Sequence, residues 1–235
     1  MTGRVAVVTL ALCLLGAFTA PTLRGEEKSF MIILKGSLTT SSQIYTNPDA
    51  PDPIDRSQFV PLKDSFGYGV ELNYRIPETN IAVSLSADYV DASAATSILR
   101  IVPVNDGYTV IPVELTGYFI IPLSGPTFGI FMGGGAGLYF GERRYQVGGV
   151  DAPSVGRTPG FGIHVLGGIS YRFNEWFSLI AEMKFRDVQF SSRNAFGVTD
   201  IRYEGILVHP ADPGDANIHT DGIVFQLGAA FNLPW

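Results

Sequence analysis

Eight segments of the chain alternate apolar residues with polar or small ones, and this pattern constrains the fold more than any other feature. The clearest example runs from Phe66 to Ile76, where every even-numbered residue is apolar and the odd positions hold Gly, Glu, Asn or Arg. A period of two places the side chains of a β-strand in two different environments. The other seven segments begin at Phe30, Ile81, Ile111, Phe128, Phe161, Phe177 and Ile223.

The connections between these segments are alternately short and long. The short ones span residues 77–79, 122–127 and 174–176, whereas the long ones span residues 39–63, 91–107, 141–159 and 190–220. The long connections are polar and rich in proline, aspartate and glycine, which favour turns and loops. Within the last of them, residues 198–207 are expected to form a small additional hairpin. The pattern predicts an all-β, antiparallel fold with short turns at one end and long loops at the other.

The apolar face could point inward to a core or outward to lipid, and alternation by itself also fits a soluble barrel. Charged residues make up only 16% of the chain, whereas about 25% of a soluble domain is charged. The polar positions are mostly glycine, serine and threonine, which would make a poor water-facing surface. We therefore expect lipid on the apolar face. A sheet in lipid must close, because an open edge leaves backbone groups unpaired.

Aromatic residues gather at both ends of the alternating segments. Those near the short turns are Phe30, Tyr74, Phe119, Phe128, Tyr171, Phe173, Phe177, Phe231 and Trp235. Those near the long loops are Phe66, Tyr68, Tyr89, Phe140, Phe161 and Phe185. Two such groups match the aromatic girdles at the two membrane interfaces. The expected fold is a closed antiparallel transmembrane β-barrel of about eight strands, with short periplasmic turns and long extracellular loops.

The charges on the inward face nearly cancel, which predicts a paired polar network inside the barrel. Its expected members are Lys35, Glu71, Arg75, Asp88, Glu114, His164, Arg172, Glu182, Lys184 and Arg186. Unpaired charges inside a narrow barrel would cost several kcal/mol, so near-balance indicates pairing. An eight-stranded barrel has an interior just wide enough for side chains to fill. A broad aqueous pore is therefore not expected.

The N-terminus is typical of a secretory signal peptide, assigned to residues 1–25. Arg4 provides a positive charge before an uncharged apolar stretch from Val5 to Ala20, and cleavage could follow Ala20 or Gly25. The stretch is short for a membrane anchor, which needs about 20 apolar residues. The only cysteine, Cys13, lies in this segment. The mature chain, a single barrel domain at residues 29–235, would then have no disulfide or thiolate metal site.

Three other sequence features could indicate a nucleotide, metal or catalytic site, but each is better explained without one. The glycine-rich run 132–137 continues as a strand, whereas a dinucleotide-binding loop would open a helix. Asp49, Asp52 and Asp55 could bind a divalent cation, but the prolines between them favour an extended, solvated loop. His209 and His219 lie in the last long connection and match no catalytic motif. These motifs lead us to expect no enzyme activity, cofactor or metal. The net charge is −6 and no basic patch is present, so we expect no nucleic-acid partner.

The last segment, from Ile223 to Trp235, alternates apolar residues up to a terminal aromatic. With this ending and the glycine-rich strand at 133–138, residues 29–235 resemble the small outer-membrane β-barrel proteins of Gram-negative-type bacteria, of the OmpA-domain, OmpX and OmpW kind. The resemblance implies location in the outer membrane among its lipids. It also implies that Phe231, Leu233 and Trp235 form the signal read by the barrel-assembly machinery, with periplasmic chaperones as further partners.

Three functions remain open from the sequence. The first is a structural or interaction role, in which a rigid barrel displays its loops outside the cell. The second is a narrow channel or transporter for small, apolar solutes, suggested by the inward apolar residues Phe131, Leu166, Ile180 and Val224. The third and weakest is an outer-membrane lipid-modifying enzyme. The fold alone does not choose among them, since such barrels host several activities.

Overall fold

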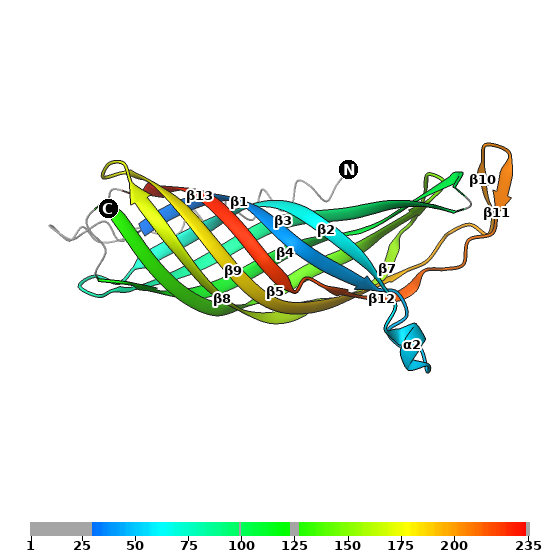
Figure 1. Ribbon diagram of the computed structural model, residues 1–235, viewed down its shortest axis with the longest axis horizontal. Coiled ribbons are helices and arrows are strands. Elements are labelled where there is room, and N and C mark those ends of the chain that lie inside the picture. The colour runs from blue at the N-terminus through cyan, green and yellow to red at the C-terminus, as the bar shows by residue number, and fades with distance from the viewer. Residues whose placement is uncertain (1–29, 99, 123–126, 234–235) are drawn as a thin grey trace.

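Eight long strands form a closed antiparallel ring in the computed structural model, which describes residues 30–98, 100–122 and 127–233 (Figure 1). The ring strands are β1 (Phe30–Tyr45), β2 (Phe59–Arg75), β3 (Ile81–Ile98), β4 (Val102–Ile120), β5 (Phe128–Val147), β8 (Gly160–Arg172), β9 (Phe177–Asn194) and β13 (Gly222–Asn232). Strand β1 pairs with β2 on one side and with β13 on the other, which closes the ring. The predicted all-β barrel is confirmed. No helix among the described residues is long and apolar enough to cross a membrane.

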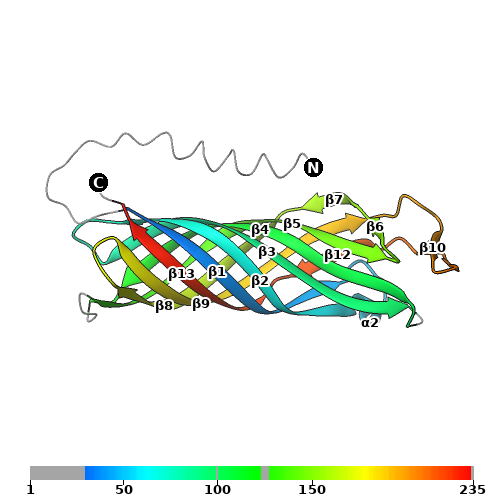
Figure 2. The ribbon, with the colours of Figure 1, turned by 90° about the horizontal axis from the view of Figure 1, so that it is seen from above.

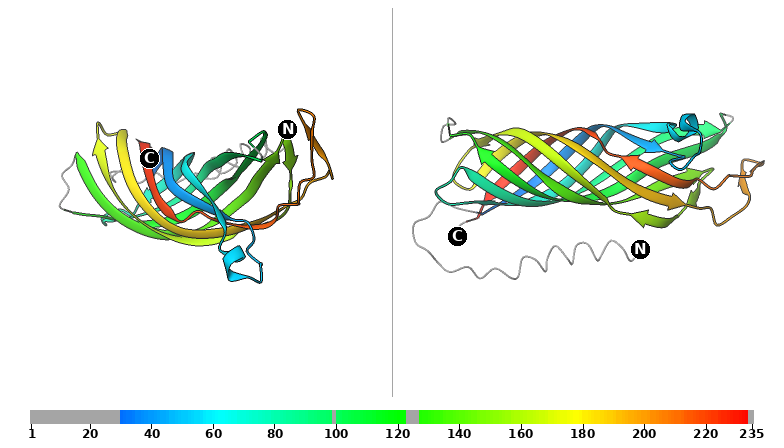
Figure 3. Two further views of the ribbon diagram at one scale, coloured as in Figure 1. Left: turned by 45° about the vertical axis from the view of Figure 1, so that its right-hand side comes forward. Right: turned by 90° about the horizontal axis from the view of Figure 1, so that it is seen from below.

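The ring continues beyond these strands through shorter elements at the long-loop end. Strand β7 (Ser154–Thr158) pairs with β9 and precedes β8, while β12 (Gly214–His219) pairs with β9 and β1 and precedes β13. Strand β6 (Val150–Ala152) pairs with β5, and α2 (Pro53–Arg56) lies in the connection between β1 and β2. Strands β10 (Ile201–Tyr203) and β11 (Ile206–Val208) form a hairpin near the predicted position. This hairpin projects beyond the end of the barrel (Figures 2 and 3).

The sequence predicted loops in the long connections, but most of their residues lie in strands, so this prediction was wrong. Residues 39–45, 59–63, 91–98, 102–107, 141–147 and 190–194 all extend the ring strands. The outward apolar alternation stops in these extensions, because their outer surfaces carry polar residues such as Ser93, Asn105 and Arg193. The polar composition of these segments therefore shows where the apolar exterior ends, whereas the strands themselves continue.

In the half of the barrel at the short-turn end, which we call the lower half, the outward side chains are mainly apolar. The inward ones are mainly polar, apart from a buried apolar cluster that includes Ile33, Phe131 and Ile180. Leu85 and Leu179 are 45% and 46% exposed on the outer wall, whereas Ser84 and Glu182 are 2% and 5% exposed. Aromatic rings pack against one another near the short turns, as in the Phe30–Tyr74 pair with ring centroids 4.7 Å apart. An apolar exterior with a polar interior is the arrangement that a lipid surround requires.

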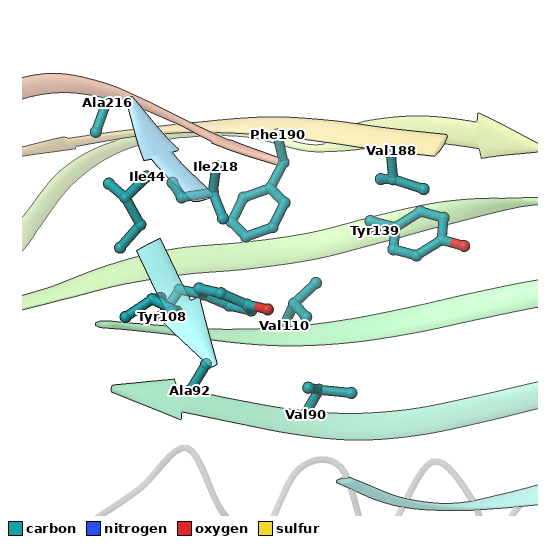
Figure 4. Packing of buried hydrophobic residues seen from close by; sticks show 11 residues of the cluster. Ile44, Val90, Ala92, Tyr108, Val110, Tyr139, Val188, Phe190, Ala216 and Ile218 are labelled. Atoms are coloured by element: carbon teal, nitrogen blue, oxygen red, sulfur yellow. The ribbon is translucent and has the colours of Figure 1, made fainter. Parts of the chain in front are cut away.

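In the other half, which we call the outer half, the arrangement reverses and apolar side chains fill the interior. The buried cluster comprises Ile44, Leu62, Val90, Ala92, Tyr108, Val110, Tyr139, Val188, Phe190, Ala216 and Ile218 (Figure 4). On β3, β4 and β9 the apolar residues change from odd to even numbers at this boundary, as from Tyr89 to Val90. We call this cluster the outer core.

Strands β1 and β2 reach the same reversal through their backbones. On β1, Thr40 and Ser41 both lie between the inward residues Thr39 and Ser42, so the inward face passes from odd to even numbers. The register against β13 and β12 shifts by one residue across this point. On β2, Asp64 has a φ of +53°, in the left-handed region. Both strands thus turn Ile44 and Leu62 into the outer core.

The outer half is not hydrogen-bonded all the way round. Among the described residues, pairing between β2 and β3 ends at Phe66 and Asp91, next to the irregularity at Asp64. Beyond this level β2 still pairs with β1, and β3 still pairs with β4. The wall between β2 and β3 therefore opens into two separate strand edges, which we call the β2–β3 seam.

Candidate functional site

The first cluster of charges in the lumen joins four strands around Lys35 of β1. Its ammonium lies 2.9 Å from Glu182 Oε2 on β9 and also forms an ion pair with Glu71 on β2. The Tyr118 hydroxyl of β4 donates to Glu71 Oε1 at 3.1 Å. All of these side chains are buried. Charge-assisted bonds in an interior shielded from water are strong, so this cluster ties opposite walls together.

A second cluster lies next to the outer core and centres on Glu114 of β4. Lys184 Nζ of β9 lies 2.5 Å from Glu114 Oε2, and the Tyr139 hydroxyl of β5 also donates to this carboxylate. His164 Nε2 lies 2.9 Å from the Thr116 hydroxyl, while its Nδ1 lies 3.9 Å from Glu114 Oε1. The two clusters together fill the lumen at this level with side chains from six ring strands.

The remaining expected members of the network do not join either cluster directly. Arg186 donates to the Thr220 carbonyl at 3.1 Å and to the Thr39 hydroxyl at 3.2 Å. Asp88 is buried against Gly69, and its Oδ1 has no hydrogen-bond partner among the described residues. Arg75 and Arg172 lie at the short-turn mouth of the barrel, lining a cavity there.

The sequence reading missed the two tyrosines that complete the clusters. Tyr118 shares the inward, even-numbered face of β4 with Glu114, and Tyr139 shares the odd-numbered inward face of β5. Their position in the alternation was therefore visible, but the expected network contained only charged residues and His164, so neither tyrosine was included. The buried ion pair of Arg143 with Asp106, at 2.7 Å, was also missed because both lie in segments read as loops.

Glycines on β5 provide the space that these charged side chains occupy. A Cβ atom at Gly137 would lie 2.8 Å from Glu114 Cγ, and one at Gly133 would lie 3.3 Å from a ring carbon of Tyr118. Side chains at these positions would force the neighbours to move. The glycine-rich strand is thus a packing device for inward bulk from β4.

The lumen is closed at the outer end as well. The Asn194 side-chain amide of β9 donates to the carbonyls of Arg143 and Ala152 at 3.0 and 2.8 Å. Above it, Val102, Val104, Val147 and Ile201 form a further apolar cluster beneath the β10–β11 hairpin. Side chains therefore occupy the lumen at this end as well as at the level of the charged clusters.

The three histidines lie in separate surroundings. His164 is buried in the lumen, His209 faces Asp200 at 2.5 Å near the β10–β11 hairpin, and the His219 ring packs on Tyr45 with centroids 4.5 Å apart. They do not share a common site. Among the described residues no group of three or more His, Cys, Asp or Glu side chains is arranged to hold a metal ion.

The ring of eight antiparallel strands, its apolar exterior and its aromatic girdles define a transmembrane β-barrel. The family model described as "Outer membrane protein beta-barrel domain" matches residues 10–231, and the chain belongs to this family of outer-membrane barrels. The expected fold class and its resemblance to small outer-membrane barrels are therefore confirmed.

Solved structures of outer-membrane barrels are similar in fold. OprG from Pseudomonas aeruginosa is 14% identical, covers 89% of this chain and 98% of its own, and has a TM-score of 0.58. Neisserial surface protein A is 13% identical with coverages of 87% and 97% and a TM-score of 0.45. Outer membrane protein W of E. coli is 14% identical with coverages of 88% and 99% and a TM-score of 0.40. No curated protein matches the chain by sequence.

Two groups of expectations lie outside the described residues and stay predictions. The signal peptide at residues 1–25 is one of them, and Trp235 of the expected assembly signal is the other. Phe231 and Leu233 are described, and both are half-buried at the short-turn end.

Proposed function

We propose that this outer-membrane barrel has a structural and interaction role, presenting its outer half to partners outside the cell. The observation that carries the proposal is the closed lumen. The two charged clusters, the outer core and the Asn194 contacts block it at successive levels. A barrel filled in this way offers a surface and not a path for solutes.

The surface that the outer half presents is an extension of the barrel sheet. Strands β3, β4, β5 and β9 all continue into the outer half, and Ile98, Ile101, Leu207 and Ile54 are exposed on its turns and connections. Exposed apolar side chains on a polar surface are typical of sites where proteins bind. The free strand edges at the β2–β3 seam add backbone donors and acceptors that an extended segment could pair with.

Conductance and surface labelling test this proposal together. In planar bilayers the purified barrel should give no defined single-channel steps. The cysteine variant Thr96→Cys should react in intact cells with a maleimide that cannot cross the outer membrane, whereas Glu78→Cys in a short turn should not. The only native cysteine, Cys13, lies in the expected signal peptide. Stable conductance steps, or equal labelling of both variants, would contradict the proposal.

Passage of small apolar solutes is the second candidate, and a specific observation favours it. The outer half has an apolar interior next to the β2–β3 seam, with Leu62 of β2 and Ala92 of β3 in the outer core. A solute entering there would meet apolar side chains before reaching the charged clusters. Ala92→Phe should then slow the uptake of an apolar dye into vesicles, and Ser93→Phe on the outer surface should not. Equal uptake in vesicles with and without the barrel would exclude this candidate.

A further inference from the structure

A cavity opens at the short-turn mouth of the barrel, on the side opposite to the surface proposed for partners. Its volume is about 410 Å³, within the usual range of about 300–1,000 Å³ for small-molecule sites. Its walls combine apolar side chains, including Ile33, Phe131 and Ile180, with polar ones such as Asn73 and Ser178. Its floor is the Lys35 cluster, through Glu71, Glu182 and Tyr118. The cavity is therefore deep, one-ended and amphipathic.

Two arginines lie at the mouth of this cavity. Arg75 ends β2 and Arg172 ends β8, and these strands are four places apart in a ring of eight, on opposite sides of the barrel. No carboxylate of the described residues lies within ion-pair distance of either guanidinium, whereas Lys35, Lys184 and Arg143 are all paired. Arginine presents several donors in a planar arrangement that suits a carboxylate. The mouth therefore favours an anionic group.

The floor favours the opposite chemistry. Two carboxylates, Glu71 and Glu182, share the single ammonium group of Lys35, so the floor carries one excess negative charge. A second anionic group entering to this depth would be repelled, whereas a hydroxyl group could donate to a carboxylate oxygen. Glu71 and Arg75 lie four residues apart on β2, which is about 13 Å along a strand. Barrel strands tilt by about 35–45°, so the depth along the barrel axis is about 10 Å. This depth suits a short aliphatic chain between the two ends.

We propose that this cavity binds small organic monoanions with an apolar body from the periplasmic side, the anionic group at Arg75 and Arg172 and the apolar chain along Ile33, Phe131 and Ile180. The site is distinct from the outer half and requires no passage through the barrel. A dianion with charges at both ends does not fit, because its inner charge would meet Glu71 and Glu182. A neutral alcohol of the same length lacks the contact with the arginines.

Methyl NMR of the full barrel in phosphatidylcholine nanodiscs tests the proposal, since detergent monomers could occupy the cavity themselves. The probes are hexanoate, 6-hydroxyhexanoate, adipate and hexanol. The two monocarboxylates should shift the methyl signals of Ile33 and Ile180 in a saturable way. They should leave Ile44 and Ile218 of the outer core unchanged. Hexanoate should bind at least about tenfold more tightly than adipate or hexanol, which is about 1.4 kcal/mol.

Variants separate this site from non-specific binding. Arg75→Gln with Arg172→Gln should weaken hexanoate binding by about tenfold or more, and Ser170→Phe should block the cavity without removing charge. The control double variant, Arg100→Gln with Arg202→Gln, removes the same charge at the outer end and should bind normally. Retention of native heat-modifiability shows that each variant is folded. The proposal is overturned if adipate binds as well as hexanoate, if the outer core responds instead, or if both cavity variants bind normally.

Discussion

The lower half of this barrel places most of its apolar side chains on the outside of the sheet, whereas the outer half places them on the inside. In the lower half, leucine, valine and aromatic side chains face out, and Lys35, Glu71 and Glu182 pair inside. In the outer half, Tyr108 and Phe190 lie inside, and serine, asparagine and glutamine face out. The surrounding solvent explains the difference, because lipid favours an apolar exterior and water a polar one. The outer half therefore has the apolar interior and polar exterior of a soluble β-protein, and the lower half has the apolar exterior of a membrane protein.

The largest expected effect concerns the interior of the lower half. Lys35→Ala leaves Glu71 and Glu182 buried without their shared cation, and breaking a buried pair costs about 3–5 kcal/mol. The free energy of unfolding should be measured by urea titration of barrels refolded into lipid vesicles. The matched variant Lys63→Ala, on the exposed surface of β2, should change it by less than about 0.5 kcal/mol. Similar losses for both variants would show that the cluster does not stabilise the lower half.

The second prediction compares the exteriors on a single strand. Leu85→Arg places a charge on the lipid-facing wall of β3, and such a change costs about 2–4 kcal/mol near the membrane centre. Ser93→Arg, eight residues further along the same face, should be tolerated because this position faces water. Folding yield in vesicles, read from heat-modifiability on a gel, measures both. If Ser93→Arg is as damaging as Leu85→Arg, the boundary between lipid and water lies further out than Asp91.

A smaller effect is expected from close packing within the lower half. A Cβ at Gly135 would lie 2.9 Å from Thr116 Cα, so Gly135→Ala must displace the β4 backbone and should cost about 1–3 kcal/mol. A Cβ at Gly117, on the outer face, has nothing nearer than Gly134 O at 3.9 Å. Gly117→Ala should therefore be close to neutral in the same urea titration. Equal costs would mean that strand propensity, and not inward space, explains the glycines.

The smallest effect compares two neighbouring arginines of the outer half. Arg144 forms an ion pair with Asp91 on the exposed surface, and such pairs contribute about 0–1 kcal/mol. Arg143, one residue earlier, points inward and pairs with Asp106 through two hydrogen bonds. Arg144→Gln should thus lower the unfolding free energy much less than Arg143→Gln. The reverse order would contradict the inward orientation of Arg143.

The sequence predicted the lower half well and the outer half poorly. Eight strands, their lipid-facing residues and the inward position of Lys35, Glu114 and Glu182 all followed from a period of two. The outer strands were missed because their apolar residues change phase, as between Phe185 and Val188 on β9. This change of phase was itself a readable sign of the membrane boundary. The reversal on β1 and β2 was not readable from the alternation, since it depends on a one-residue register shift near Thr40 and on the left-handed backbone at Asp64.

The sequence predicted only in part which charged side chains pair inside the lumen. Alternation tells which residues face inward, but the choice of partner depends on the relative register of strands far apart in the chain. Lys35 meets Glu182 because β1 and β9 both flank β13, which follows from closure of the ring. The cavity at the mouth could not be foreseen, because it arises where the side chains of eight strands leave space unfilled.

The reversed sidedness of the outer half also affects how the barrel enters and leaves the membrane. The long hairpins are expected to end on the extracellular side, so each one would cross the hydrocarbon layer during insertion. On the way, outward residues such as Ser93 and Gln189 meet lipid tails before the outer core has packed. Extraction would require the same crossing in reverse after that core has formed. We therefore expect the polar exterior of the outer half to slow any return of the barrel through the lipid.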